Sequence, residues 1–292
     1  KLNLDILPLV IHGTGNTMTK NDFLLKDGSI TLKFLPRISP TNVSFGTTYS
    51  ERAKKIGNHF RKEFLLLSKK IEEPLYFKDQ LLSSYIYKGP VLEWYTRFKI
   101  RNENYYQIFH EILPKNGKIL DIGCGYGMMA HMLHCTSPQR QILGIDYDED
   151  KILLAKNIPT RKTNMNFEHC NVLSFAFEKY DGIIMSDILH YLRPKEQISM
   201  ICKSIESLLP GGTLVIRDGN TEYKDRHLKT QITEFLSTKI FSFNMTGENE
   251  LSFLSGSTIR KIVASYDVTI NEIENSRITS NVLFIIKSNP VS

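Results

Sequence analysis

Three glycines at alternating positions have the clearest chemical meaning in this chain of 292 residues: Gly123, Gly125 and Gly127. They follow an apolar run that ends in Asp121 and Ile122. Glycine lets the backbone turn sharply and lets a ligand approach the main chain, and the helical sequence after the loop offers its N-terminus to that ligand. The loop therefore predicts a small-molecule site. It matches the GxGxxG loop of dinucleotide-binding proteins less well, and the chain has no GxxxxGK[ST] phosphate-binding loop.

Short apolar strands alternate with amphipathic helices from residue 118 onward, and this alternation predicts the elements that position the loop. The predicted strands cover 118–122, 141–146, 166–170, 180–186 and 213–218. Such a pattern indicates a doubly wound, mostly parallel, Rossmann-like α/β sheet with helices on both faces. The ligand is expected at the carboxyl ends of the strands.

These motifs resemble class I S-adenosylmethionine-dependent methyltransferases, whose glycine loop follows a strand as [DE]xGxGxG. An acid also stands 25 residues after Asp121, at Asp146. The segments YDGIIMSDILHYL (180–192) and LLPGGTLVIRD (208–218) resemble the fourth and fifth strands of that family, and 281–287 resembles its closing antiparallel strand. The resemblance covers about 118–288 and implies S-adenosyl-L-methionine as cofactor and methyl transfer as the reaction.

The resemblance also implies cofactor-binding residues at the strand ends. Asp146 is expected on the ribose hydroxyls, because a carboxylate can accept hydrogen bonds from both. Asn171 is expected beside the adenine, with a role as a turn residue as the alternative, and Cys124 could be a small filler. The expected set is Asp121, Gly123, Cys124, Gly125, Gly127, Asp146, Tyr147, Asn171, Val172, Ser186 and Asp187.

His190 is the candidate catalytic base, since it should lie just beyond the fourth strand and its ordinary pKa is near neutrality. A structural or substrate-positioning role is the alternative. The chain lacks the (D/N)PPY sequence that marks transfer to a nucleic-acid base. His131, His134 and Cys135 have a spacing that could mimic a metal site, but surface or packing positions on a helix beside the sheet are favoured, and no metal is inferred.

An aromatic-rich helical lead-in is predicted over residues 76–117. In the family such helices commonly cover the cofactor, and ring faces near a sulfonium favour its positive charge. Tyr87 and Tyr95 are the expected lid residues, with Tyr191 on the substrate side, whereas Trp94 is expected in the core. Tyr85 is a further candidate for the lid.

The first quarter of the chain carries most of the basic excess. Residues 1–75 hold 12 Lys and Arg against 7 Asp and Glu, whereas the whole chain has a formal charge of +6. Residues 1 to about 60 resemble the C-terminal end of lysophospholipid acyltransferases, without the HxxxxD motif. The helix predicted at 51–72 is basic and amphipathic, so contact with an anionic membrane is an alternative to a solvated charged face. The first residue is Lys, so upstream domains of a longer polypeptide are also expected.

The sequence thus predicts three parts: an acyltransferase-like remnant (1–75), the lead-in (76–117) and a methyltransferase domain (118–292). The expected acceptor is small or linked to a lipid or carrier, and aromatic by analogy with fused proteins of aryl polyene or flexirubin-type pigment synthesis. Methylation of tRNA or protein, or a non-catalytic cofactor-binding scaffold, are the alternatives, and nucleic acid is not favoured as a partner. Four scattered cysteines without a CxxC pair, and no long apolar run, favour the cytoplasm, with the inner face of the membrane as an alternative.

Overall fold

A computed structural model describes residues 4–14, 30–71, 73–86, 89–102, 105–158, 164–222, 251–274 and 281–290. The chain divides into two compact units, 1–76 and 77–292. Tyr87 lies outside the described residues, as do residues 223–250. Within the described part, no helix is both long and apolar enough to cross a membrane.

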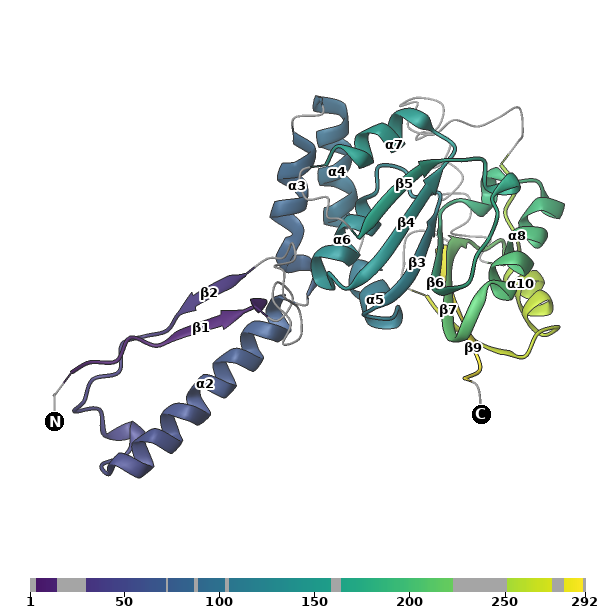
Figure 1. The fold of residues 1–292 in the computed structure, drawn as a ribbon. Coiled ribbons are helices and arrows are strands. Elements are labelled where there is room, and N and C mark those ends of the chain that lie inside the picture. The colour runs from purple at the N-terminus through teal and green to yellow at the C-terminus, as the bar shows by residue number, and fades with distance from the viewer. Residues whose placement is uncertain are drawn as a thin grey trace. The chain divides into compact units, whose positions relative to one another are not determined.

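Unit 1 is a two-stranded hairpin beside one long helix (Figure 1). Strand β1 (Leu9–His12) pairs antiparallel with β2 (Thr31–Phe34), and α2 (Tyr49–Ile71) follows a short 3-10 turn, η1 (Val43–Phe45). The buried apolar side chains of this unit are few: Val10, Leu35, Ile38, Leu67 and Ile71. One face of the hairpin leaves Ile11, Leu32 and Phe34 exposed in the described structure, so this unit buries little apolar surface.

Unit 2 is built on a seven-stranded sheet with the order β5-β4-β3-β6-β7-β9-β8 (Figure 1). The strands are β3 (Gly117–Ile122), β4 (Arg140–Asp146), β5 (Met165–His169), β6 (Tyr180–Ser186), β7 (Leu208–Gly219), β8 (Val268–Ile273) and β9 (Asn281–Ser288). The first five are parallel, and β9 is antiparallel to both β7 and β8. The prediction of a mostly parallel, Rossmann-like sheet with a closing antiparallel strand is confirmed.

Helices cover both faces of this sheet, as the alternating pattern predicted. One core cluster joins the sheet to α3 (Lys78–Ile86), α4 (Pro90–Asn102), α5 (Tyr105–Ile112), α6 (Met128–Thr136) and α7 (Glu149–Lys156). The other joins it to α8 (Pro194–Glu206) and α10 (Gly256–Val263). Chain order reverses where β3 lies beside β6, and such a reversal is where doubly wound sheets bind their ligands.

One detail of the lead-in differs from the sequence prediction. The prediction that Trp94 belongs to the core was wrong, because its ring is 52% exposed and stacks on Phe98. Residues four apart share one face of a helix, and this face of α4 points outward. Strand β8 was not predicted.

Candidate active site

The glycine loop links the carboxyl end of β3 to the start of α6. Gly123, Gly125 and Gly127 have φ values of 69°, 53° and 74°, a region that costs other residues about 1–2 kcal/mol. A Cβ on Gly127 would lie 2.8 Å from the Phe167 ring, and one on Gly123 would lie 2.5 Å from Ile188 Cδ1. A Cβ on Gly125 would meet no atom within 4 Å. The backbone at Gly125 is therefore open to a ligand, whereas side chains already pack against the backbone at Gly123 and Gly127.

Asp146 joins the loop to the end of β4. Its Oδ2 accepts a hydrogen bond of 2.7 Å from the Gly125 N–H, and its Oδ1 accepts one of 2.9 Å from the Asp148 N–H. A carboxylate has about four lone-pair positions, so acceptor capacity remains for two hydroxyls. The geometry is compatible with the predicted ribose contact.

Asp121 is a buried carboxylate directly before the loop, with 3% of its surface exposed. Its Oδ2 has no hydrogen-bond partner in the described part of the chain. Burial, and secondly the charge of Asp146, raise the pKa of Asp121 to about 7. A buried carboxylate in this state is well matched to a cationic ligand, because a positive charge would supply the missing partner and favour the ionised form.

The predicted cofactor residues that follow β5, β4 and β3 mostly contact residues close to them in the structure. Asn171 caps a short turn, η3 (Val172–Ser174), by accepting from the Leu173 N–H at 3.0 Å, and Val172 is buried. Asn171 thus has the role of a turn residue, which the sequence analysis gave as the alternative to an adenine contact. Tyr147 is exposed and touches His169 edge-on. Burial raises the pKa of the Cys124 thiol, which packs against Gly144 as a filler would.

The carboxyl end of β6 holds an ion pair that the sequence did not reveal. Asp187 is the only non-glycine residue with a positive φ, 57°, in the described chain. Its carboxylate pairs with Arg217 of β7 and accepts from Asn281 of β9 at 3.4 Å, and Ser186 Oγ donates to it at 3.4 Å. The Arg217 guanidinium lies 4.2 Å from the centre of the Tyr105 ring. Contacts with β7, with β9 and with the adjacent Ser186 therefore hold Asp187 at the end of β6.

His190 lies beside this pair and is 1% exposed. It belongs to a 3-10 turn, η4 (Leu189–Tyr191), and its Nδ1 lies 2.7 Å from Asp218 Oδ1 at the end of β7. The Phe253 ring stacks on the imidazole at 4.9 Å, and the Tyr191 ring lies at 4.2 Å. The sequence indicated His190 but missed Asp218, although Asp218 lies at the end of β7, the neighbour of the strand that His190 follows. A histidine oriented by a carboxylate on one nitrogen can exchange a proton at the other.

The lead-in tyrosines approach the loop. Tyr85 donates a hydrogen bond of 2.7 Å to the carbonyl of Tyr126, within the glycine loop, and the Tyr95 ring meets the Tyr126 ring edge-on at 6.0 Å. The Lys151 ammonium lies 5.7 Å from the centre of the Tyr126 ring. The structure thus brings the predicted lid residue Tyr95 next to the loop.

The predicted histidine pair of α6 packs in the core. His131 and His134 are both buried, and the His131 ring stacks on Phe167 at 5.4 Å. No cluster of three or more His, Cys, Asp or Glu side chains suited to a metal occurs among the residues that the structure describes.

Comparison with known proteins agrees with this geometry. A family model described as a methyltransferase domain matches residues 113–254. The chain is 22% identical to a carboxy-S-adenosyl-L-methionine synthase of Campylobacter hominis over 219 residues, 72% of this chain and 91% of that protein. It is 32% identical to a probable tRNA methyltransferase 9B of Homo sapiens over 114 residues, 39% of this chain and 24% of that protein.

A crystal structure of a possible exported protein from Bordetella parapertussis shares the fold, with a TM-score of 0.50, 14% identity and coverage of 69% of this chain and 73% of that one. The family-model match and the similarity to the carboxy-S-adenosyl-L-methionine synthase indicate the cofactor and the reaction class, and the structural neighbour shows the fold. The chain carries a class I S-adenosylmethionine-dependent methyltransferase domain, and S-adenosyl-L-methionine is its cofactor.

Proposed function

We propose that the domain methylates an oxygen or carbon of an aromatic acceptor, either small or linked to a lipid or carrier, with His190 as the base. The observation that carries the proposal is the hydrogen bond between His190 Nδ1 and Asp218 Oδ1 at 2.7 Å. With its Nδ1–H donated to Asp218, neutral His190 has its lone pair on Nε2, where it can accept a proton from a hydroxyl or an acidic carbon.

The cofactor supplies a methyl group on a positively charged sulfur. In the proposal, the Gly125 backbone, Asp121 and Asp146 hold the cofactor, and Tyr95 covers it. Ser186 and Asp187 complete the cofactor site at the end of β6. The remaining requirement is deprotonation of the acceptor, which general-base catalysis can accelerate about 10²- to 10⁴-fold.

The aromatic nature of the acceptor is supported by the rings around His190. Tyr191 and Phe253 both lie within 5 Å of the imidazole, measured between ring centres. Flat apolar walls of this kind favour a flat acceptor. The wider assignment, to aryl polyene or flexirubin-type pigment synthesis in the cytoplasm at the inner face of the membrane, rests on the acyltransferase-like residues 1–60 and is part of the proposal.

The test is methyl transfer from labelled S-adenosylmethionine to a panel of phenols, free and carrier-bound, by the purified chain. We expect labelled O- or C-methyl products, and at least a hundredfold lower turnover for His190→Ala with cofactor affinity unchanged. Normal turnover by His190→Ala would remove this residue as the base.

Methylation of tRNA is the second candidate, favoured by the 32% identity over 114 residues to the human protein named a probable tRNA methyltransferase 9B. The same labelled cofactor should therefore be offered to total tRNA and total protein. Label in either fraction, and none in phenols, would replace the aromatic acceptor by that macromolecule. If the chain binds the cofactor but transfers label to none of these fractions, the result would favour the non-catalytic cofactor-binding scaffold. A mass spectrum of the cofactor after incubation would reveal a modified cofactor, the product named for the Campylobacter relative.

A further inference from the structure

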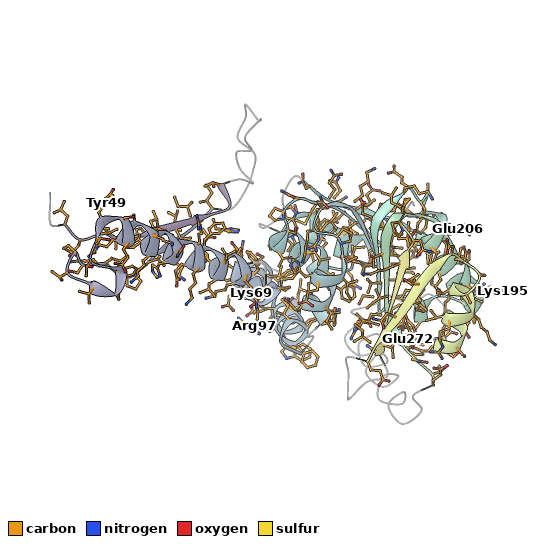
Figure 2. The ribbon with its side chains drawn as sticks, turned by 90° about the horizontal axis from the view of Figure 1, so that it is seen from below. Tyr49, Lys69, Arg97, Lys195, Glu206 and Glu272 are labelled. Atoms are coloured by element: carbon orange, nitrogen blue, oxygen red, sulfur yellow. The ribbon has the colours of Figure 1, made fainter. Side chains whose placement is uncertain are left out.

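From Lys54 to its C-terminal end, the outward face of α2 is a cationic sector without an acid. At 100° per residue, one arc of about 100° on this part of the helix holds Lys54, Asn58, Arg61, Lys62, Leu65 and Lys69. Glu51 precedes the sector on the same face and pairs with Lys55. The buried residues of α2, Leu67 and Ile71, lie on the other side of the helix. All six side chains of the sector are exposed. Figure 2 shows the helix with side chains projecting along its length from Tyr49 to Lys69.

The four cations of the sector are not neutralised by ion pairs with the described residues. Three described acids of unit 1 pair with other cations: Asp5 with Arg37, Glu51 with Lys55 and Glu63 with Lys33. The distance from residue 54 to residue 69 corresponds to about 22 Å along the helix at 1.5 Å per residue. The sector therefore forms an exposed row of positive charge that suits an anionic surface.

An exposed leucine lies within this row. Leu65 is 67% exposed at the middle of the sector, and Leu66 beside it is 51% exposed. Phosphate backbones offer charge but no apolar layer, whereas the interface of an anionic bilayer offers both. We propose that α2 binds an anionic lipid surface through this sector, with the cations at the headgroups and Leu65 inserted between them. This inference is independent of the acceptor of the methyltransferase domain.

Binding of the whole chain to lipid vesicles tests the proposal. The chain should sediment with vesicles of mixed phosphatidylglycerol and phosphatidylcholine, much less with pure phosphatidylcholine, and less as salt is added. Lys62→Glu with Lys69→Glu should weaken binding at least about 25-fold, since each cation near the surface contributes about fivefold. Lys195→Glu with Lys203→Glu on α8 makes the same change in net charge on the other unit and should leave binding near the native level.

The result that overturns the proposal is equal binding by the two double variants, or no preference for phosphatidylglycerol. Leu65→Asn distinguishes a bilayer from a nucleic acid. We expect it to weaken vesicle binding several-fold while leaving any binding to duplex DNA or RNA unchanged. Binding to nucleic acid that Lys62→Glu with Lys69→Glu abolishes, in the absence of vesicle binding, would assign the sector to nucleic acid instead. Thermal melts of each variant check that the fold is kept.

Discussion

His190 and Asp218 are 28 residues apart in sequence, yet Nδ1 of the histidine lies 2.7 Å from Oδ1 of the aspartate. They meet because β6 and β7 are parallel neighbours in register, with Ser186 opposite Arg217. The Asp218 carboxylate also accepts from the backbone N–H of His190 at 3.3 Å and of Gly219 at 2.7 Å. The aspartate is therefore held in place before it orients the imidazole.

The first prediction concerns this pair as one catalytic unit. Asp218→Asn should lower kcat about 10- to 100-fold with an unchanged dissociation constant for S-adenosylmethionine, because the amide keeps only one of the two acceptor oxygens and cannot balance a charged imidazole. Residues that act together are non-additive, so the double variant His190→Ala with Asp218→Asn should be no slower than His190→Ala alone. Single-turnover rates and calorimetry provide the two measurements. If the fold-loss of kcat in the double variant equals the product of the two single-variant losses, the residues act separately.

Asp121 should make cofactor affinity depend on pH. Because the pKa of Asp121 is raised to about 7, a cationic ligand must displace a proton below that pH. Affinity for S-adenosylmethionine should therefore fall about tenfold between pH 8 and pH 6 and level off above about pH 8. Asp121→Asn should bind weakly at every pH. Asp181→Asn, which alters a carboxylate at the opposite end of the sheet, is the control and should keep the native pH profile.

The stability of the unliganded protein should change in a related way. The folded-state pKa of Asp121 lies above its unfolded value of 3.8, so the folded state holds the proton more tightly and loses stability as pH rises from about 4 to 7. Three pH units correspond to roughly 4 kcal/mol. At pH 8, Asp121→Asn should therefore melt several degrees higher than the native chain while binding the cofactor less well. A lower melting temperature for this variant at pH 8 would contradict the assigned protonation.

The sequence was sufficient for the sheet and for the loop, because both depend on local patterns. Each parallel strand is a short apolar run bounded by turn residues, and three glycines at alternating positions after such a strand indicate a sharp backbone turn. All five predicted parallel strands overlap strands of the structure: β6 has the predicted ends, and the ends of the other four differ by at most five residues.

Contacts across strands could not be predicted in the same way. The Arg217–Asp187 pair and the His190–Asp218 contact both depend on the register between β6 and β7, which a single sequence does not specify. Trp94 shows a related limit. Helical spacing tells which residues share a face, but it does not tell which face is covered when several faces of a helix carry apolar residues.

The loop glycines offer a matched pair of variants. Gly125→Ala adds a methyl group in open space, so its cost to stability should be the backbone conformation alone, about 1–2 kcal/mol. Gly127→Ala has the same backbone cost but also forces a Cβ to within 2.8 Å of Phe167, so it should destabilise the domain further. We expect Gly125→Ala to fold and to lose most cofactor affinity. Denaturant titration and calorimetry would separate the two effects, and native affinity in Gly125→Ala would show that the cofactor does not approach the backbone there.

The last prediction concerns Arg140, a fully buried guanidinium at the start of β4. It donates to carbonyl oxygens at the C-terminal ends of two helices: His110 and Leu113 at the end of α5, and Leu133 near the end of α6. It also donates to Pro114 O at 2.7 Å and to Thr136 Oγ1 at 3.4 Å. One guanidinium nitrogen lies 3.2 Å from Nδ1 of the His110 ring. Burial lowers the pKa of Arg140 to about 10, so it stays charged at neutral pH.

Replacing this guanidinium should destabilise the domain strongly, because several buried carbonyl groups would lose their donors at once. Each such loss costs about 1–3 kcal/mol, so Arg140→Met should lower the free energy of unfolding by at least about 3 kcal/mol. Arg140→Lys should recover little of this, since one ammonium cannot reproduce the planar fork of donors. Arg97→Met is the matched control, because Arg97 projects from α4 and makes only a partly exposed pair with Glu93 (Figure 2). It should change stability by less than about 1 kcal/mol. Similar denaturation midpoints for Arg140→Met and Arg97→Met would show that Arg140 does not join the two helix ends.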